Sequence, residues 1–225
     1  HIALKTRGRL NMSTEKLDTE IRQEQIIKAA MRLAETGGLQ ALNLANIARH
    51  VGLVPTALYR HFPNKEALLD ALLSSIQTRL LENVSIVCRE TEDPIERLRG
   101  LLYRHVRLIR ENQGIPRIVF SPEFYTNGSQ RKTKSYQGIR GYLERVGAII
   151  SEAQRDGRIR RDCPPETLSM MFLGLIQPAA FLWFLSDGEF DVTKHAERAW
   201  RIFSQAICCE EIHERCQPAA ETVDH

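Results

Sequence analysis

The stretch from Asn43 to Lys65, which reads NLANIARHVGLVPTALYRHFPNK, constrains the fold more than any other part of this 225-residue chain. In its first half, apolar residues recur at i, i+3, i+4 and i+7, the spacing of one helix face. These residues are Leu44, Ile47, Ala48 and Val51. Gly52 follows, and because glycine adopts left-handed backbone cheaply, we expect a sharp turn there. The first half therefore predicts a short amphipathic helix that ends at Gly52.

The residues after Gly52 predict a second short helix. Pro55 suits the first position of a helix, since its φ is already helical and it lacks an N–H. Leu58 and Phe62 lie one turn apart and are expected to pin this helix to the first. Its start and outer flank then carry Pro55, Thr56, Ala57, Tyr59, Arg60 and His61. In a helix-turn-helix, a second helix of this kind enters the major groove of DNA.

The charge of this stretch is compatible with a nucleic-acid partner. From Gln40 to Lys65 there is no acidic residue, whereas Arg49, Arg60 and Lys65 are present. Lysine, arginine, hydroxyls and helix N-termini supply the phosphate contacts on which DNA affinity largely rests. Asn64 can cap a third helix that starts at Lys65, and we expect the positive end of that helix to bind a phosphate. Taken alone, the stretch is also compatible with a small helical domain that binds no DNA.

Four matches through this region carry a resemblance to a known family. They are Ile47-Ala48, Gly52, Leu58 to Pro63, and Lys65 to Leu68. In these residues the chain resembles the tetracycline-repressor (TetR) family of bacterial transcriptional regulators. Upstream, Ile26, Ala30, Leu33 and Ala34 mark a first helix that ends at Gly37-Gly38, where the family has a turn. The resemblance implies an N-terminal DNA-binding domain over residues 12–80, with its helix-turn-helix over 43–62.

The resemblance also implies roles for single residues. Asn43 matches a position that caps the second helix of the domain and contacts a phosphate, and Tyr59 and Lys65 match backbone-contacting positions. The positions that match groove-facing residues of the family are Pro55, Thr56, Ala57 and His61. Val54 departs from the pattern, because the family often has a serine there. Without that hydroxyl the recognition helix loses about 1 kcal/mol of capping, which Pro55 partly offsets.

Composition bounds the class of protein. With 43% hydrophobic residues the chain can bury a substantial core, and its net charge of +3 is too small to argue DNA binding alone. Five scattered cysteines favour a reducing cytoplasm over a disulfide framework. The run from Met170 to Leu185 is too short for a bilayer and predicts a buried helix, so we expect no membrane segment. Residues 1–11 are interpreted as an expression-derived extension, upstream read-through or a disordered segment, and residues 216–225 as a disordered tail.

The remainder of the chain has helical periodicity, which predicts an all-α fold of about nine helices. A linking helix follows Lys65, a second begins at the Asp93-Pro94 start signal, and another runs up to Gly157. The last two are expected over about 165–185 and 192–214, with a kink at Pro178. No segment alternates at period two, so no sheet is expected. Residues 81–215 then form a C-terminal helical domain for effector binding and dimerisation.

The last two predicted helices are rich in apolar residues on more than one side. In the family this pair forms a four-helix dimer interface, so the resemblance implies a homodimer and a palindromic operator. The residues expected at this interface are Leu175, Phe181, Trp183, Phe184, Trp200, Phe203 and Ile207. The alternative is that they only close the core of one protomer.

The resemblance further implies a cavity for a small-molecule effector inside the C-terminal helices. Aromatic and methionine side chains suit the lining of such a cavity and suggest a largely apolar ligand. The candidates are Tyr103, His105, Phe120, Phe124, Tyr125, Tyr142, Met170 and Met171. Each of them could equally be a packing residue. Five arginines between Arg97 and Arg110 suggest a solvated face rather than a site for an acidic ligand.

The C-terminal segment CCEEIHERC contains the metal ligands cysteine and histidine. Cys209 and Cys216 are seven residues apart, about 10.5 Å along a helix, which is too far for both to bind one zinc. These cysteines could act only as small apolar side chains near a helix end. The alternatives are a zinc site completed by a dimer partner, or redox sensing by Cys208-Cys209.

No catalytic grouping or phosphate loop is present, so neither an enzyme nor a cofactor is expected. The leading hypothesis is a repressor released from its operator by a small molecule. The alternatives are a redox- or metal-responsive regulator with the same DNA-binding domain, and a helical ligand-binding protein that binds no DNA.

Overall fold

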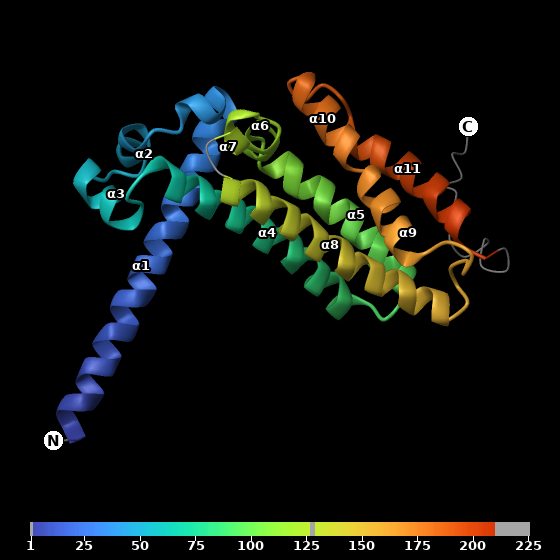
Figure 1. Ribbon diagram of the computed structural model, residues 1–225, viewed down its shortest axis with the longest axis horizontal. Coiled ribbons are helices and arrows are strands. Elements are labelled where there is room, and N and C mark those ends of the chain that lie inside the picture. Colours follow the sequence, from blue (N-terminus) through green and yellow to red (C-terminus); the bar gives the residue numbers. More distant parts are fainter. Residues whose placement is uncertain (1, 127–128, 210–225) are drawn as a thin grey trace, which may run out of the picture. The chain divides into compact units, whose positions relative to one another are not determined.

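The computed structural model describes residues 2–126 and 129–209, with side chains described from residue 19 onward except at Ser129. Within these residues the fold is all-α, as predicted, with eleven α-helices and one 3-10 helix (Figure 1). The helices are α1 (Ile2–Gly37), η1 (Gly38–Ala41), α2 (Leu44–His50), α3 (Pro55–His61), α4 (Lys65–Glu90), α5 (Pro94–Glu111), α6 (Gly114–Val119), α7 (Glu123–Thr126), α8 (Ser129–Arg155), α9 (Pro165–Gly174), α10 (Gln177–Leu185) and α11 (Val192–Ile207). The described part contains no strand, only an isolated bridge between Ile159 and Cys208.

The chain divides into two compact units. Unit 1 comprises residues up to Ile76 together with Asn112–Arg131, and unit 2 comprises Gln77–Glu111 and the residues from Lys132 onward. The change of unit after Ile76 lies close to the boundary expected at residue 80. The segment 112–131 differs from the expectation, since it belongs to unit 1 rather than to the C-terminal part. This segment belongs to unit 1 because α6 packs against α1. The approach of the two helices is so close that a Cβ atom on Gly114 would lie 2.3 Å from the Met31 carbonyl oxygen.

The hydrophobic core of unit 1 lies between its first helices. Helix α1 packs against α2 and α6, and α2 packs against α3. Fully buried residues come from α1, α2, α3 and α4, and include Ile26, Ala30, Ile47, Leu58, Leu68 and Leu72. Helix α1 begins at Ile2, so residues 2–11, which were expected to lie outside the fold, are helical backbone.

In unit 2, helix α11 packs against both α5 and α10. Its core includes Leu98, Leu101, Leu102, Val146, Ile150 and Phe172. The single helix expected over 165–185 is wrong, because the structure has two helices there, α9 and α10. Pro178 in the first turn of α10 cannot donate a backbone hydrogen bond, which accounts for a break where a kink was expected. Helix α11 ends at Ile207, and the predicted continuation beyond Cys209 lies outside the described residues.

One stretch among the described residues, Pro165–Leu185, is long and apolar enough to cross a membrane by length and composition. It was expected to be too short, but the apolar stretch starts earlier than Met170. The stretch is divided between α9 and α10, and one side of it, including Phe172 and Trp183, is buried in unit 2. We therefore interpret it as a pair of core helices.

Candidate nucleic-acid interface

The helix-turn-helix starts with a capped helix and a glycine turn. Asn43 precedes α2, and its side-chain oxygen accepts a hydrogen bond from the backbone N–H of Asn46 at 2.8 Å. Gly52 has φ +69°, a conformation that other residues adopt at a cost. Val54 precedes α3 and makes no side-chain cap, while Pro55 occupies the first turn. The structure thus confirms the predicted cap at Asn43, the turn at Gly52 and the absence of a side-chain cap at Val54.

Helix α3 has one buried side and one exposed side. Leu58 is 0% exposed and Phe62, directly after the helix, is 4% exposed, so both hold α3 to the core of unit 1. Pro55, Thr56, Tyr59 and Arg60 are exposed, and Ala57 and His61 are half-buried. Tyr59, the one tyrosine of this helix, is 51% exposed. The outer side of α3 is therefore available to a duplex.

The start of α4 adds a second candidate contact. The side-chain oxygen of Asn64 accepts a hydrogen bond from the N–H of Ala67 at 2.8 Å, which confirms the predicted cap. Lys65 Nζ donates to the carbonyl oxygen of Leu39 at 3.1 Å and so ties α4 to η1. An ammonium has three donors, and this bond uses one. Lys65 can thus hold the domain together and still meet a phosphate.

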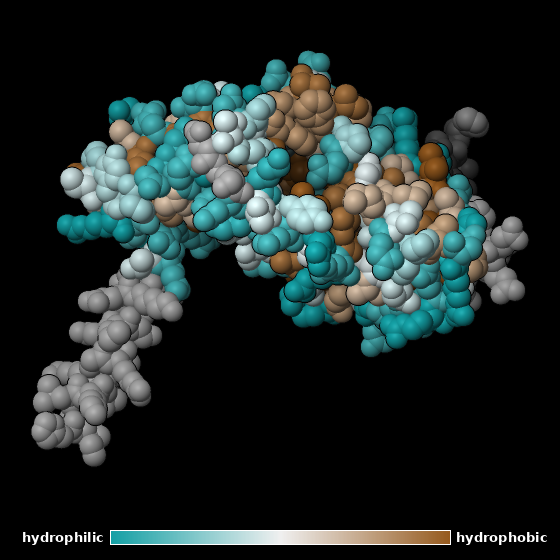
Figure 2. All heavy atoms as spheres, viewed as in Figure 1, coloured by the Kyte–Doolittle hydropathy of each residue, from teal (hydrophilic) through white to brown (hydrophobic). Residues whose placement is uncertain are grey.

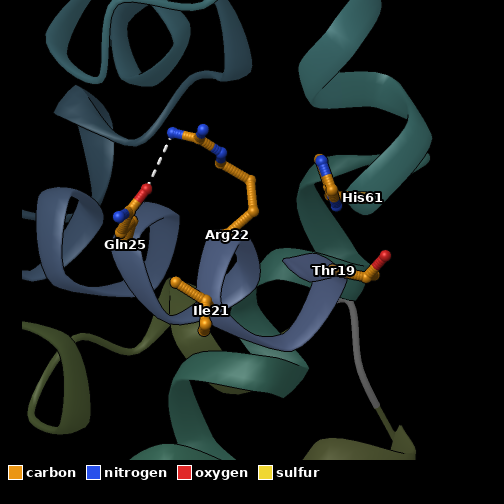
Figure 3. A pocket seen from close by; sticks show the side chains of 5 residues that line it. All are labelled: Thr19, Ile21, Arg22, Gln25 and His61. Carbon is orange, nitrogen blue, oxygen red and sulfur yellow. Dashed lines mark hydrogen bonds between the residues drawn. The ribbon is translucent and has the colours of Figure 1, made fainter. Parts of the chain in front are cut away.

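A cleft of about 500 Å³ lies beside α3 (Figure 3). It is lined by Thr19, Ile21, Arg22 and Gln25 of α1 and by His61 of α3. None of these side chains is acidic, and Arg22 Nη1 donates to Gln25 Oε1 at 2.7 Å. The Nδ1 atom of His61 is buried without a hydrogen-bond partner in the structure. A guanidinium and a hydroxyl next to the recognition helix make Arg22 and Thr19 further candidates for a phosphate contact, and no local motif in the sequence marks them.

The residues expected to line an effector cavity fall into both units. Phe120, Phe124 and Tyr125 belong to unit 1, whereas Tyr103, His105, Tyr142, Met170 and Met171 belong to unit 2. Two pairs are in contact: the ring centroids of Phe124 and Tyr125 lie 5.1 Å apart, and His105 Nδ1 lies 3.4 Å from the Tyr142 hydroxyl. Tyr103 lies beneath the Arg99 guanidinium, and Met170 and Met171 are exposed on α9. The last two therefore face away from the core of unit 2.

His105 and Tyr142 form a buried polar pair between α5 and α8. Their rings meet edge to face with centroids 5.7 Å apart. Burial lowers the pKa of His105 to about 4, so the imidazole is neutral at neutral pH. Burial also raises the pKa of Tyr142 well above its ordinary value. The pair offers neutral hydrogen-bonding groups inside unit 2.

The arginines of α5 are neutralised or hydrogen-bonded within unit 2. Arg97 pairs with Glu152 at 2.7 Å, Arg107 pairs with Glu111 at 2.7 Å, and Arg104 pairs with Glu90. Arg99 lies 3.6 Å from Glu96, and Arg110 donates to the Thr193 hydroxyl at 3.0 Å. Such partners agree with a structural role for this face.

The predicted dimer residues are only partly accessible. Trp183, Trp200, Phe203 and Ile207 are buried inside the protomer, which contradicts their assignment to an interface. The pattern at i, i+3 and i+4 marked the apolar face of α11, but that face packs against α5 and α10. Phe181 is exposed, and Leu175 and Phe184 are half-buried. The large apolar residues that are exposed on these helices are Met170, Met171, Phe181, Leu182, Leu185 and Ile202.

The cysteines form no metal site among the residues that the structure describes. No group of three or more His, Cys, Asp or Glu side chains there could hold a metal ion. Cys208 and Cys209 are half-buried thiols after α11. His213 and Cys216, which entered the alternative of a zinc site, lie outside the described residues.

Two family models match the chain. The model of the bacterial regulatory proteins of the tetR family matches residues 26–72, which include the helix-turn-helix. The model of the tetracyclin repressor-like C-terminal domain matches residues 91–207, more than half of the chain. These matches exclude the alternative of a helical ligand-binding protein unrelated to DNA-binding regulators.

Individual relatives agree with the family models. The chain is 25% identical over 191 residues to the nucleoid occlusion factor SlmA of Vibrio vulnificus (strain YJ016), covering 83% of this chain and 95% of that protein. The transcriptional regulator FadR from Bacillus subtilis, solved with stearoyl-CoA, superposes with a TM-score of 0.71 at 22% identity, covering 82% and 98%. AibR, solved with isovaleryl coenzyme A and operator DNA, gives 0.63 at 23%, covering 80% and 97%. The chain belongs to the tetR family of bacterial regulatory proteins, and it is a DNA-binding regulator of the helix-turn-helix type.

Proposed function

We propose that this protein represses transcription by binding an operator with α3 and the start of α4. The observation that carries the proposal is the exposed flank of α3, with Thr56, Tyr59 and Arg60, on a helix anchored by the buried Leu58. Thr56 and Ala57 lie near its N-terminal end, which reads base edges in a helix-turn-helix. Tyr59 and Lys65 contact phosphates on either side of that groove. Arg22 and Thr19 extend the phosphate contacts along the duplex.

The protein acts as a homodimer on a palindromic operator. The support is the exposed apolar surface on the outer sides of α9, α10 and α11, part of which is visible over α10 in Figure 2. An apolar surface of this kind is costly in water and marks an interaction site. An isologous interface between two copies of it would present two recognition helices with the two-fold symmetry of a palindrome. We place this DNA-binding dimer in the cytoplasm.

A small-molecule effector releases the operator, and acyl-coenzyme A thioesters are the class to test first. The support is the family membership together with two structural neighbours that were solved with stearoyl-CoA and isovaleryl coenzyme A. Unit 2 combines aliphatic core residues with the neutral His105–Tyr142 pair, a suitable environment for an acyl chain and one polar group. A coupling of about 1–3 kcal/mol would change operator affinity about five- to a hundredfold.

The experiment starts from DNA. The wild-type protein selects duplexes from a random-sequence pool, and fluorescence anisotropy measures the affinity for the selected duplex between 50 and 200 mM salt, the range in which phosphate contacts show as a steep decline. Stearoyl-CoA, isovaleryl-CoA and free coenzyme A are then titrated into the complex. Release by a thioester but not by free coenzyme A supports the effector class, and release by none of them contradicts it. Selection that enriches no sequence contradicts operator binding itself.

An oxidant provides the matched test of the redox alternative. Under this proposal, diamide leaves the complex intact. If diamide releases the DNA and Cys208→Ser abolishes that release, the regulator senses oxidation rather than a thioester.

A further inference from the structure

A buried arginine in unit 1 lies far in sequence from the helix-turn-helix and contacts the helix that follows it. Arg131, in the first turn of α8, is 2% exposed. Its Nε donates to Asp70 Oδ1 at 3.0 Å, its Nη2 donates to the Glu66 carboxylate, and its Nη1 donates to the Phe124 carbonyl oxygen at 2.6 Å. The guanidinium also lies over the Phe124 ring, 5.1 Å from its centroid. One side chain thus joins the first two turns of α4 to α7 and α8.

The charge of this cluster does not explain why it is there. Moving an arginine out of water is costly, and replacing a buried ion cluster by apolar side chains of similar volume is often neutral or stabilising. What the guanidinium supplies is geometry. Its donors have fixed directions, and they reach Glu66 and Asp70, one helical turn apart, only when α4 has one position relative to the first turn of α8.

The first turns of α4 are the part of this helix that is adjacent to the DNA-facing residues. Only Phe62, Pro63 and Asn64 lie between the end of α3 at His61 and the start of α4 at Lys65. Phe62 is buried and Asn64 caps α4, so a displacement of α4 would move α3 and Lys65 with it. Glu66 and Asp70 are also the first acidic residues after the acid-free stretch. Both pair with Arg131, so a variant that lacks only this arginine leaves their negative charge uncompensated next to the phosphate-binding end of α4.

We propose that Arg131 is a positioning residue for operator binding. It holds the first two turns of α4 through Glu66 and Asp70, and thereby sets the position of Lys65 and α3 against the duplex. This inference rests on the proposed operator binding. Arg131 is 61 positions from Asp70 in sequence. Its role in DNA binding is indirect, because it acts through α4 rather than by contacting the duplex.

The test compares three variants on the duplex selected by the wild-type protein. Arg131→Met fills the same space without donors, and Arg131→Lys keeps the charge but cannot bridge both carboxylates and the carbonyl. Arg140→Met is the matched control, because Arg140 is an exposed arginine on the same helix that pairs with Glu144. Circular dichroism and thermal unfolding establish that each variant is folded. Anisotropy gives the affinity and its salt dependence.

We expect Arg131→Met and Arg131→Lys to bind about tenfold or more weakly, within the range of typical couplings between sites. The slope of log affinity against log salt should fall by about 2, for one lost phosphate contact in each of two protomers. Arg140→Met should keep the wild-type affinity and slope. Wild-type affinity in both folded Arg131 variants would overturn the inference while leaving operator binding intact, whereas failure of the wild type to bind any selected duplex would overturn the proposed function first.

A variant without the acids separates geometry from charge. Glu66→Gln, Asp70→Asn and Arg131→Met together remove the arginine and both negative charges. If Arg131 positions α4, this triple variant remains as weak as Arg131→Met. Recovery of wild-type affinity would show that Arg131 only neutralises the acids, and would contradict the positioning role.

Discussion

Tyr59→Ala should separate the DNA contact from the stability of the fold. Tyr59 is 51% exposed on α3, and its neighbour Leu58 carries the packing of that turn. Substitutions at such surface positions change the free energy of unfolding by about 0.5 kcal/mol or less. The lost hydrogen bond to a phosphate contributes about 1 kcal/mol in each protomer. For a dimer the loss is about 2 kcal/mol, which is about thirtyfold in operator affinity.

The assay is anisotropy with the selected duplex, beside thermal unfolding of the same preparations. A tyrosine hydroxyl is neutral and releases no counterion, so the salt dependence of binding should not change. Tyr136→Ala is the matched control, because Tyr136 is a similarly exposed tyrosine on α8 in the other unit. The reasoning is refuted if Tyr59→Ala binds as tightly as the wild type, or if Tyr136→Ala loses the same affinity.

Four further predictions concern the cap, the anchor, the dimer and the buried imidazole. Asn43→Asp should keep the cap of α2 and its stability, yet weaken DNA binding by placing a carboxylate beside a phosphate; unchanged affinity in the anisotropy assay would remove Asn43 from the interface. Leu58→Ala should lower the free energy of unfolding in urea by about 2–5 kcal/mol, and a loss below 1 kcal/mol would contradict its anchoring role. Leu182→Glu should yield a folded monomer in sedimentation equilibrium, whereas a persistent dimer would place the interface elsewhere. Burial lowers the folded-state pKa of His105 from 6.5 to about 4. The contribution of this residue to the free energy of unfolding is therefore complete above pH 6.5 and is lost as the pH falls toward 4, by about 3 kcal/mol. His105→Gln should flatten this pH dependence of stability in urea unfolding, and an unchanged pH dependence would refute the lowered pKa of His105.

The local features of the helix-turn-helix were predictable from sequence because their causes are local. The Asn43 cap, the turn at Gly52 and the Asn64 cap each depend on one residue and its immediate neighbours. The break between α9 and α10 was only half predicted. Pro178 indicated a kink, but whether a helix bends or ends there depends on the packing around it.

The buried side chains of α11 show what periodicity cannot supply. The spacing of Trp200 and Phe203 identified an apolar face, but not which neighbour covers it, and that neighbour is the same protomer. Arg131 was missed for a related reason. In sequence it stands in the polar run SQRKTK, which is typical of a solvated helix start, and its partners on α4 are 61 and 65 residues away. Only the fold brings these charges together.

Methylation interference on the selected duplex tests the central claim most directly, namely that α3 enters the major groove. Guanine N7 is exposed in that groove, whereas adenine N3 is exposed in the minor groove. We expect N7 methylation to block binding at two symmetric half-sites, and N3 methylation between them to have little effect. Binding that tolerates N7 methylation at every position would contradict the account.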